Sequence, residues 1–154
     1  MYSPELIETA NKFINNAYRD LRAAENSKQS QDYEAANSRA YYAIFNAIRA
    51  VLALENAEFK THSRTIGHFN KNYIHAGVFS TNFSKIISLA SETRNNSDYD
   101  VHYEASYDDA ELVIADAGRF LEAMAEYVST QIHPERSDLH PFYTEPENED
   151  EIEL

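Results

Sequence analysis

Apolar residues recur at intervals of three and four along most of this chain, a spacing that places side chains on one face of an α-helix. The first such stretch runs from about residue 4 to about residue 26. Ser3, Pro4 and Glu5 precede it as an N-cap, a proline at the first helical position and an acid facing the helix dipole. Its expected buried stripe consists of Leu6, Ile7, Ala10, Ile14, Ala17 and Leu21. The segment 27–30 is expected to end this helix.

A second stretch, capped by Ser30 or Asp32 and running to about Glu55, is apolar on nearly every side in its second half. Small or apolar side chains follow one face, at Ala36, Ala40, Ala43, Ala47, Ala50 and Leu54. The other faces carry Tyr41, Tyr42, Ile44, Phe45, Ile48, Val51 and Leu52. Such a helix is predicted to be central, with its aromatic residues in the core. Arg39 and Arg49 are expected to reach solvent along their stems or to pair with acids beside the core.

Three more helices are predicted. One covers about residues 63–76, with Ile66, Phe69 and Tyr73 inward, and Gly77 ends it as a left-handed cap. The next runs from about 81 to 95 and frays or stops in the polar segment 95–98, whose helix propensity is poor. The last begins at a near capping box, 106–109, and ends near residue 132. The buried face of the last helix should be Ala110, Val113, Ala117, Leu121, Met124 and Val128, and that of the one before it Phe83, Ile86, Ile87 and Ala90.

Composition supports a single helical domain. The chain has 154 residues but only three glycines and four prolines, and no alternating apolar pattern of useful length, which argues against a sheet. This length is enough for one domain with its own core. We predict that residues 1–132 form the domain. Residues 133–154, rich in proline and acids, are predicted to be a disordered acidic tail.

Several classes of protein are excluded or disfavoured. The chain has no cysteine, so disulfides, thiolate zinc sites and cysteine nucleophiles are excluded. No apolar run approaches the roughly 20 residues needed to span a bilayer, and no leader pattern begins the chain. We therefore expect a cytoplasmic protein without membrane contact. No His-Glu-x-x-His or Glu-x-x-His pattern and no glycine-rich phosphate loop occurs, so we expect neither a metal nor a cofactor.

The net charge of -13 is unevenly distributed. Between Phe59 and Ser91 there is no acid, although the segment contains three lysines, one arginine and three histidines. Five of these basic residues are spaced by four, four, three and four: Lys60, Arg64, His68, Lys71 and His75. On a helix they form one cationic stripe, supported by His62, that can follow the phosphates of a nucleic acid. The alternative is a solvated polar face.

The segment from Arg94 to Tyr103 gathers residue types suited to chemistry on a phosphate. Arg94 offers a guanidinium, and His102 offers an imidazole that exchanges protons near neutral pH. In a continued helix, Asp98 lies four residues from each of them and can pair with either. In an extended chain, Arg94 and His102 lie up to roughly 26 Å apart at ~3.3 Å per residue. The alternative is an exposed helix end with a simple Arg–Asp pair.

Three motifs, in this order, resemble those of the HEPN-domain family: Ser38-Arg39-Ala40-Tyr41-Tyr42-Ala43-Ile44-Phe45-Asn46-Ala47, Lys60-Thr61-His62-Ser63, and Arg94-x-x-x-Asp98-Tyr99-Asp100. The resemblance spans roughly residues 4–128. It implies an all-α, up-and-down four-helix bundle with an additional short helix. It also implies a homodimer in which motif arginines of both chains face one cleft. Many members are toxins or regulators encoded beside a minimal nucleotidyltransferase, and a subset are metal-independent RNases.

The RNase members carry an arginine, four to six intervening residues and a histidine. Arg94 matches the arginine, but Tyr99 and Asp100 occupy the nearer histidine positions, and His102 follows after seven residues. A phenol with a pKa of about 10 is a poor base at neutral pH. If this chain resembles the RNases in activity, Arg94 and His102 are its catalytic candidates. His102 would move the proton of an attacking 2'-hydroxyl, and Arg94 would stabilise the charge on the phosphate.

The preferred hypothesis is non-enzymatic. The chain is expected to be a HEPN protein of a toxin–antitoxin or nucleotidyltransferase-associated system, whose dimer cleft binds a nucleotide, RNA or a partner protein. The binding candidates are Asn95, Asp98, Tyr99 and Tyr103 near the arginine, with Lys60, His62, Arg64, His68 and Lys71 in the basic region. Some partner transferases adenylylate a tyrosine near the motif, which would be Tyr99 or Tyr103 here. A second alternative to the preferred hypothesis is a structural module that acts through the acidic tail.

Overall fold

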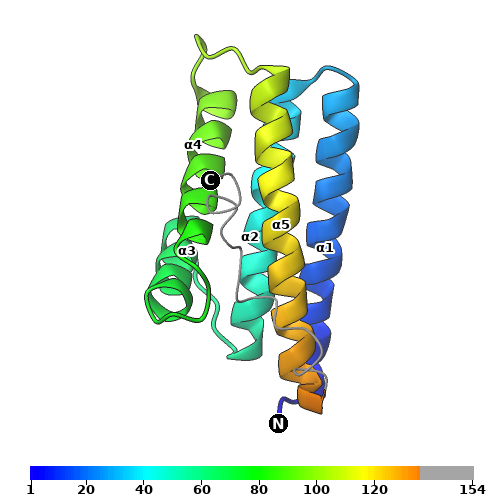
Figure 1. Cartoon of the computed structure of the whole chain (residues 1–154), viewed down its shortest axis with the longest axis vertical. Coiled ribbons are helices and arrows are strands. Elements are labelled where there is room, and N and C mark those ends of the chain that lie inside the picture. The colour runs from blue at the N-terminus through cyan, green and yellow to red at the C-terminus, as the bar shows by residue number, and fades with distance from the viewer. Residues whose placement is uncertain (136–154) are drawn as a thin grey trace, which may run out of the picture.

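The computed structural model describes residues 1–135, and the regular structure of this part of the chain is helical. The elements are α1 (Pro4–Gln29), α2 (Tyr33–Leu54), α3 (His62–Phe69), η1 (Asn70–Ile74), α4 (Asn82–Tyr99) and α5 (Tyr107–Ile132). Four long helices run up and down beside one another, and the short α3 lies at one side (Figure 1). The predicted all-α bundle with an additional short helix is confirmed. Most of the predicted tail, residues 136–154, lies outside the described residues.

Small polar side chains begin four of these helices. The caps of α1, α2, α3 and α5 are Ser3, Asp32, Thr61 and Ser106. Each side-chain oxygen accepts a hydrogen bond, at 3.1–3.2 Å, from the backbone N–H three residues later. The predicted starts of α1, α2 and α5 are therefore confirmed, with Asp32 rather than Ser30 as the second cap. Helix α1 continues to Gln29, a few residues beyond its predicted end.

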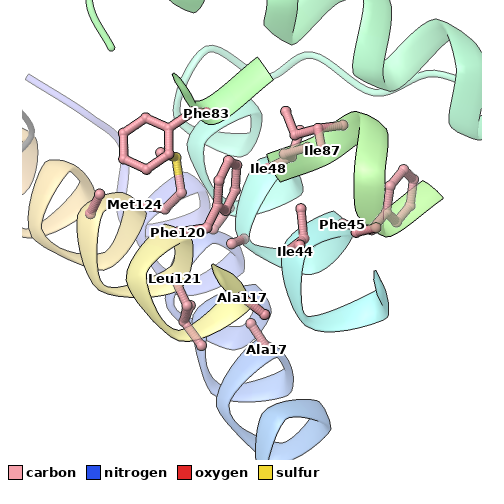
Figure 2. Packing of buried hydrophobic residues seen from close by; sticks show 14 of the residues in the cluster. Ala17, Ile44, Phe45, Ile48, Phe83, Ile87, Ala117, Phe120, Leu121 and Met124 are labelled. Atoms are coloured by element: carbon pink, nitrogen blue, oxygen red, sulfur yellow. The ribbon is translucent and has the colours of Figure 1, made fainter. Parts of the chain in front are cut away.

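Helix α2 is the central element, as predicted, because it contacts α1, α3, α4 and α5. Its residues from Ala43 to Leu54 are almost all buried. Helix α1 approaches with alanines at seven-residue intervals, Ala10, Ala17 and Ala24, all with no exposed surface. In Figure 2, Ala17 of α1 and Ala117 of α5 point toward one another beside the larger side chains Phe120, Leu121 and Met124. Small residues thus allow close approach where three helices meet.

The helix predicted over residues 63–76 is divided into two parts. Helix α3 ends at Phe69, and the next five residues form the π-helical turn η1, whose His75 N–H donates to Asn70 O at 2.8 Å. Gly77 follows with φ +88°, as expected of a left-handed cap. Lys60 precedes α3, and Lys71 lies in the π turn, where α-helical spacing no longer aligns side chains. Of the five residues in the predicted stripe, Arg64 and His68 lie in α3 and the other three lie outside it. The five residues therefore do not form one stripe on a single α-helix.

The prediction that α4 frays or stops within residues 95–98 is wrong, because the helix continues to Tyr99. Asn37 of α2, with no exposed surface, donates from Nδ2 to Ser97 Oγ at 3.1 Å. Arg94 and Asp98 also form an ion pair four residues apart. These contacts outweigh the low helix propensity of the segment. Consequently, Arg94 and Asp98 lie on one face of a formed helix.

The close alanine contacts give a test of the packing. We expect Ala17→Leu to lower the free energy of unfolding by about 1–3 kcal/mol, since extra methylenes in a filled core force neighbouring helices to shift. Urea denaturation measures the change. Ala115→Leu, at an exposed position of α5, is the matched control and should lie within about 0.5 kcal/mol of the parent. Equal stability of the two variants would contradict this account of the core.

Candidate functional site

The guanidinium of Arg94 is turned toward the central helix. Its Nη2 donates to the hydroxyl of Tyr42 at 2.8 Å, and its Cζ lies 5.1 Å from the ring centroid of Tyr41 and 5.4 Å from that of Tyr42. Nε lies 3.1 Å from Asp98 Oδ2, an ion-pair contact without hydrogen-bond geometry. Burial opposes the charge of Arg94, but the phenols and Asp98 around it hold its pKa above the ordinary value. Arg94 is therefore a firmly charged and positioned cation.

An exposed ring completes the surroundings of Arg94. Cζ of Arg94 lies 5.7 Å from the ring centroid of Tyr99, which is 71% exposed. Asn95 Oδ1 accepts a longer hydrogen bond, 3.4 Å, from Arg94 Nη1. The guanidinium thus lies among three phenol rings, one of which faces solvent. A planar cation beside an exposed aromatic ring can contact the phosphate and the base of a nucleotide together.

His62, at the start of α3, joins this site through Tyr41. Its Nδ1 lies 2.9 Å from the Tyr41 hydroxyl, and its ring stacks on Phe45 with centroids 4.0 Å apart. Burial raises the pKa of Tyr41 to about 12, so this phenol keeps its proton at neutral pH. Burial and the nearby cations Arg94 and Arg49 lower the pKa of His62. Thus His62 is neutral at physiological pH, with Nδ1 held by Tyr41.

The catalytic candidate His102 lies apart from this group. It follows α4 in an exposed turn, and its backbone N–H donates to Asp100 Oδ1 at 2.9 Å. Among residues 1–135, no hydrogen bond or ion pair joins its side chain to Arg94. Tyr103 is engaged elsewhere, because its hydroxyl donates to Asp109 Oδ2 at 3.0 Å. Burial and this hydrogen bond raise its pKa to about 12. Of the predicted site residues, Asn95, Asp98, Tyr99 and His62 gather around Arg94.

The remaining basic candidates surround α3. His68 Nε2 lies 3.2 Å from both carboxylate oxygens of Glu55, which also accepts a 2.6 Å hydrogen bond from the Tyr73 hydroxyl. His68 is therefore engaged by an acid at the end of α2. Lys60, Arg64 and Lys71 are exposed. In the described part of the chain, no three carboxylates and imidazoles lie close enough to hold a metal ion.

Sequence reasoning assigned Tyr41 and Tyr42 to the core and missed their polar role. Tyr41 is indeed buried and Tyr42 partly so, but their hydroxyls contact His62 and Arg94. Two adjacent tyrosines in an apolar helix indicate polar contacts of this kind, since a buried phenol normally needs a hydrogen-bond partner. None of the described helices has both the length and the apolar character required to cross a bilayer.

Comparison with known proteins places this chain in a family. The HEPN domain profile matches residues 10–127. The candidate toxin MJ0142 of Methanocaldococcus jannaschii is 30% identical over 117 residues, which cover 76% of this chain and 80% of that protein. The UPF0332 protein glr0978 of Gloeobacter violaceus is 29% identical, over 75% of this chain and 93% of its own length. A second candidate toxin of M. jannaschii, MJ0605, is 27% identical over 79% of this chain and 90% of its own.

The fold has a solved counterpart. The crystal structure of ST0689, an archaeal HEPN homologue, matches with a TM-score of 0.57 at 24% identity and covers 77% of this chain and 97% of its own. At this identity the match supports the helical fold alone. The family profile covers well over half of the chain, and the relatives are covered over most of their length. The resemblance carried by the three sequence motifs is confirmed, and the chain belongs to the HEPN-domain family.

Proposed function

We propose that this chain is the HEPN protein of a toxin–antitoxin or nucleotidyltransferase-associated system, and that the site around Arg94 binds RNA or a nucleotide. The names of two relatives as candidate toxins support the first part. One observation carries the second: the Arg94 guanidinium lies among phenol rings, of which Tyr99 is 71% exposed. Such a site offers a cation for a phosphate and a ring for a base.

Arg94 Nε is buried against Asp98, so a phosphate reaches it by displacing that side chain. Asp98, whose side chain is 30% exposed, contacts Nε without accepting a hydrogen bond from it. A phosphate oxygen at this position gains the charge-assisted hydrogen bond that Asp98 does not make. Stacking of a base on an aromatic ring contributes about 1–3 kcal/mol in single-stranded nucleic acid complexes. Tyr99 supplies that ring, and Asn95 and Asp98 can contact the edge of the base.

We propose that a second copy of the chain completes the cleft. Val101, which is 91% exposed, presents an apolar side chain just after the end of α4. Burying Val101 against its counterpart stabilises a homodimer and leaves the Tyr99 ring open to a base. Two copies joined here bring their Arg94 residues to the same side of the assembly. A cleft with two such cations suits a chain of phosphates better than a single phosphate does.

Replacing the arginine tests the binding site. We expect Arg94→Ala to weaken the binding of a labelled single-stranded RNA by about 10- to 100-fold, since a hydrogen bond to a charged group contributes about 1.5–3 kcal/mol. Fluorescence anisotropy at fixed ionic strength measures the Kd. The matched control is Arg22→Ala, which removes an equal charge from an exposed position of α1. Equal losses of RNA affinity in the two variants would indicate nonspecific attraction by charge alone. That result would contradict a binding site at Arg94.

A partner nucleotidyltransferase is proposed to modify Tyr99 rather than Tyr103. The Tyr99 phenol is largely exposed, whereas the Tyr103 hydroxyl is held by Asp109, and burial raises the pKa of Tyr103 to about 12. In this reaction the phenol oxygen attacks the α-phosphorus of ATP and pyrophosphate leaves. The phenolic proton passes to a base of the transferase. The product is a tyrosine–AMP ester next to Arg94.

Mass spectrometry distinguishes the two tyrosines. After coexpression with a minimal nucleotidyltransferase encoded beside this chain, we expect the intact mass to rise by one AMP group. The gain should disappear in Tyr99→Phe and persist in Tyr103→Phe, because the Tyr99 phenol is largely exposed and the Tyr103 hydroxyl is held by Asp109. Peptide mapping locates the group. Modification at Tyr103, or an unmodified chain that also fails to copurify with the transferase, would count against this partner.

Metal-independent RNA cleavage is a second candidate, favoured by the contact of both His62 and Arg94 with Tyr41. In this mechanism an imidazole takes the proton of a ribose 2'-hydroxyl as its oxygen attacks the adjacent phosphorus. The 5'-oxygen then leaves with a proton returned to it. Arg94 stabilises the added negative charge of the intermediate. His62 is a second candidate for this imidazole, in addition to His102, which the sequence suggested.

The pH dependence of cleavage tests which imidazole acts. Because burial and two cations lower the pKa of His62, its neutral, proton-accepting form persists to lower pH. With His62 as the base, the cleavage rate in EDTA should rise with pH and level off below the ordinary histidine pKa of about 6.5. His62→Ala should then abolish cleavage, and His102→Ala should not. The reverse result assigns the role to His102, and cleavage that survives both changes excludes the mechanism.

A further inference from the structure

A cavity of about 510 Å³ opens beside His62, between α1, α2 and the segment that joins α2 to α3. We call it the Arg49 cavity. Its lining combines aromatic and basic side chains: Phe13, Phe45, Phe59, Arg49, Lys60 and His62. Glu58 is the acid among the lining residues. This volume falls within the range of about 300–1,000 Å³ that small-molecule sites occupy.

Within residues 1–135, the two cations of the cavity have no protein counter-ion. Arg49 lies with Cζ 4.4 Å from the ring centroid of Phe13 and 5.8 Å from that of Phe45. Across residues 1–135, neither Arg49 nor Lys60 forms a hydrogen bond or an ion pair. By contrast, Arg39 on the same helix pairs with Asp20 at 3.5 Å. The N–H donors of Arg49 therefore remain available, although the cation is only partly exposed.

A stripe of α2 connects this cavity to the Arg94 site. Tyr41, Phe45 and Arg49 recur every four residues and so share one face of the helix. His62 packs in the middle of this face, on Phe45, and its Nδ1 is held by Tyr41. Its Nε2 makes no hydrogen bond within the described part of the chain. His62 thus offers a third nitrogen donor or acceptor to a molecule in the cavity.

We propose that the Arg49 cavity binds a small molecule that carries both a planar ring and an anionic group. The ring packs against Phe13, Phe45 or Phe59, and the anion lies between Arg49 and Lys60. An anion suits the site because Arg49, which is only partly exposed, makes no hydrogen bond or ion pair within residues 1–135. A planar ring suits the site because three phenylalanine rings, Phe13, Phe45 and Phe59, are part of the apolar lining. This site shares His62 with the proposed Arg94 site but is centred on Arg49, and its test does not depend on RNA binding.

Titration calorimetry with the full chain tests the proposal. The probes are 5'-AMP and indole-3-acetate, which carry a ring with a phosphate or a carboxylate, and adenosine and inorganic phosphate, which each lack one of the two parts. We expect at least one ring-bearing anion to bind, and both incomplete probes to bind about tenfold or more weakly. Binding of 5'-AMP identifies a phosphate as the anion, and binding of indole-3-acetate identifies a carboxylate. Failure of both ring-bearing anions to bind overturns the proposal.

Substitution and NMR then locate the ligand. Arg49→Gln keeps a polar stem of similar shape and should lower the affinity by about tenfold or more, whereas Arg39→Ala, the matched control on the same helix, should leave it unchanged. Thermal unfolding confirms that both variants fold. Ligand-induced shifts should centre on Phe13, Phe45 and His62. Shifts centred on Tyr99, or equal affinity in the parent and Arg49→Gln, overturn the proposal, and neither result bears on RNA binding through Arg94.

Discussion

The burial of α2 on all sides is the constraint from which the rest of the structure follows. Since this helix contacts α1, α3, α4 and α5, each of its faces must match a different neighbour. The alanines provide close approach, and the larger residues fill the space between the helices. Burying a polar group on such a helix costs free energy unless a neighbour supplies a hydrogen-bond partner. Tyr41 and Tyr42 find theirs in His62 of α3 and Arg94 of α4, and each contact holds one of these helices against α2.

Positive charge is concentrated along one face of α2 in an otherwise acidic protein. Arg94 lies against Tyr41, Arg49 lies near Phe45, and His62 packs between them. Two fixed cations near a partly buried imidazole disfavour its protonation, which lowers the pKa of His62. Arg94 and Arg49 therefore attract anions to this face, and the neutral imidazole of His62 adds no third positive charge. The family alone does not dictate such chemistry, because a fold can carry many different sites.

Much of this arrangement could be predicted from the sequence, and the exceptions have a common cause. The caps Ser3, Asp32 and Ser106 and the helical spacing of apolar residues are local signals, so α1, α2 and α5 were predicted nearly to their ends. The length of α4 depends on a contact with Asn37, and the division of α3 from η1 has no clear marker in local propensity. At the site, the motif identified Arg94, Asp98 and Tyr99. That Arg49 has no ion-pair partner within residues 1–135 is a tertiary property that spacing does not reveal.

The buried amide of Asn37 determines more than the length of α4. Its Nδ2 donates to Ser97, while its Oδ1 accepts no hydrogen bond among the described residues. Rotating α4 about its axis by even one residue would move Ser97 away and leave the amide with neither group satisfied, at a cost of about 1–3 kcal/mol. The amide therefore fixes the rotational setting of α4. The direction in which Arg94 points is thus specified by a side chain of another helix, 60 residues away in the sequence from the serine that it holds.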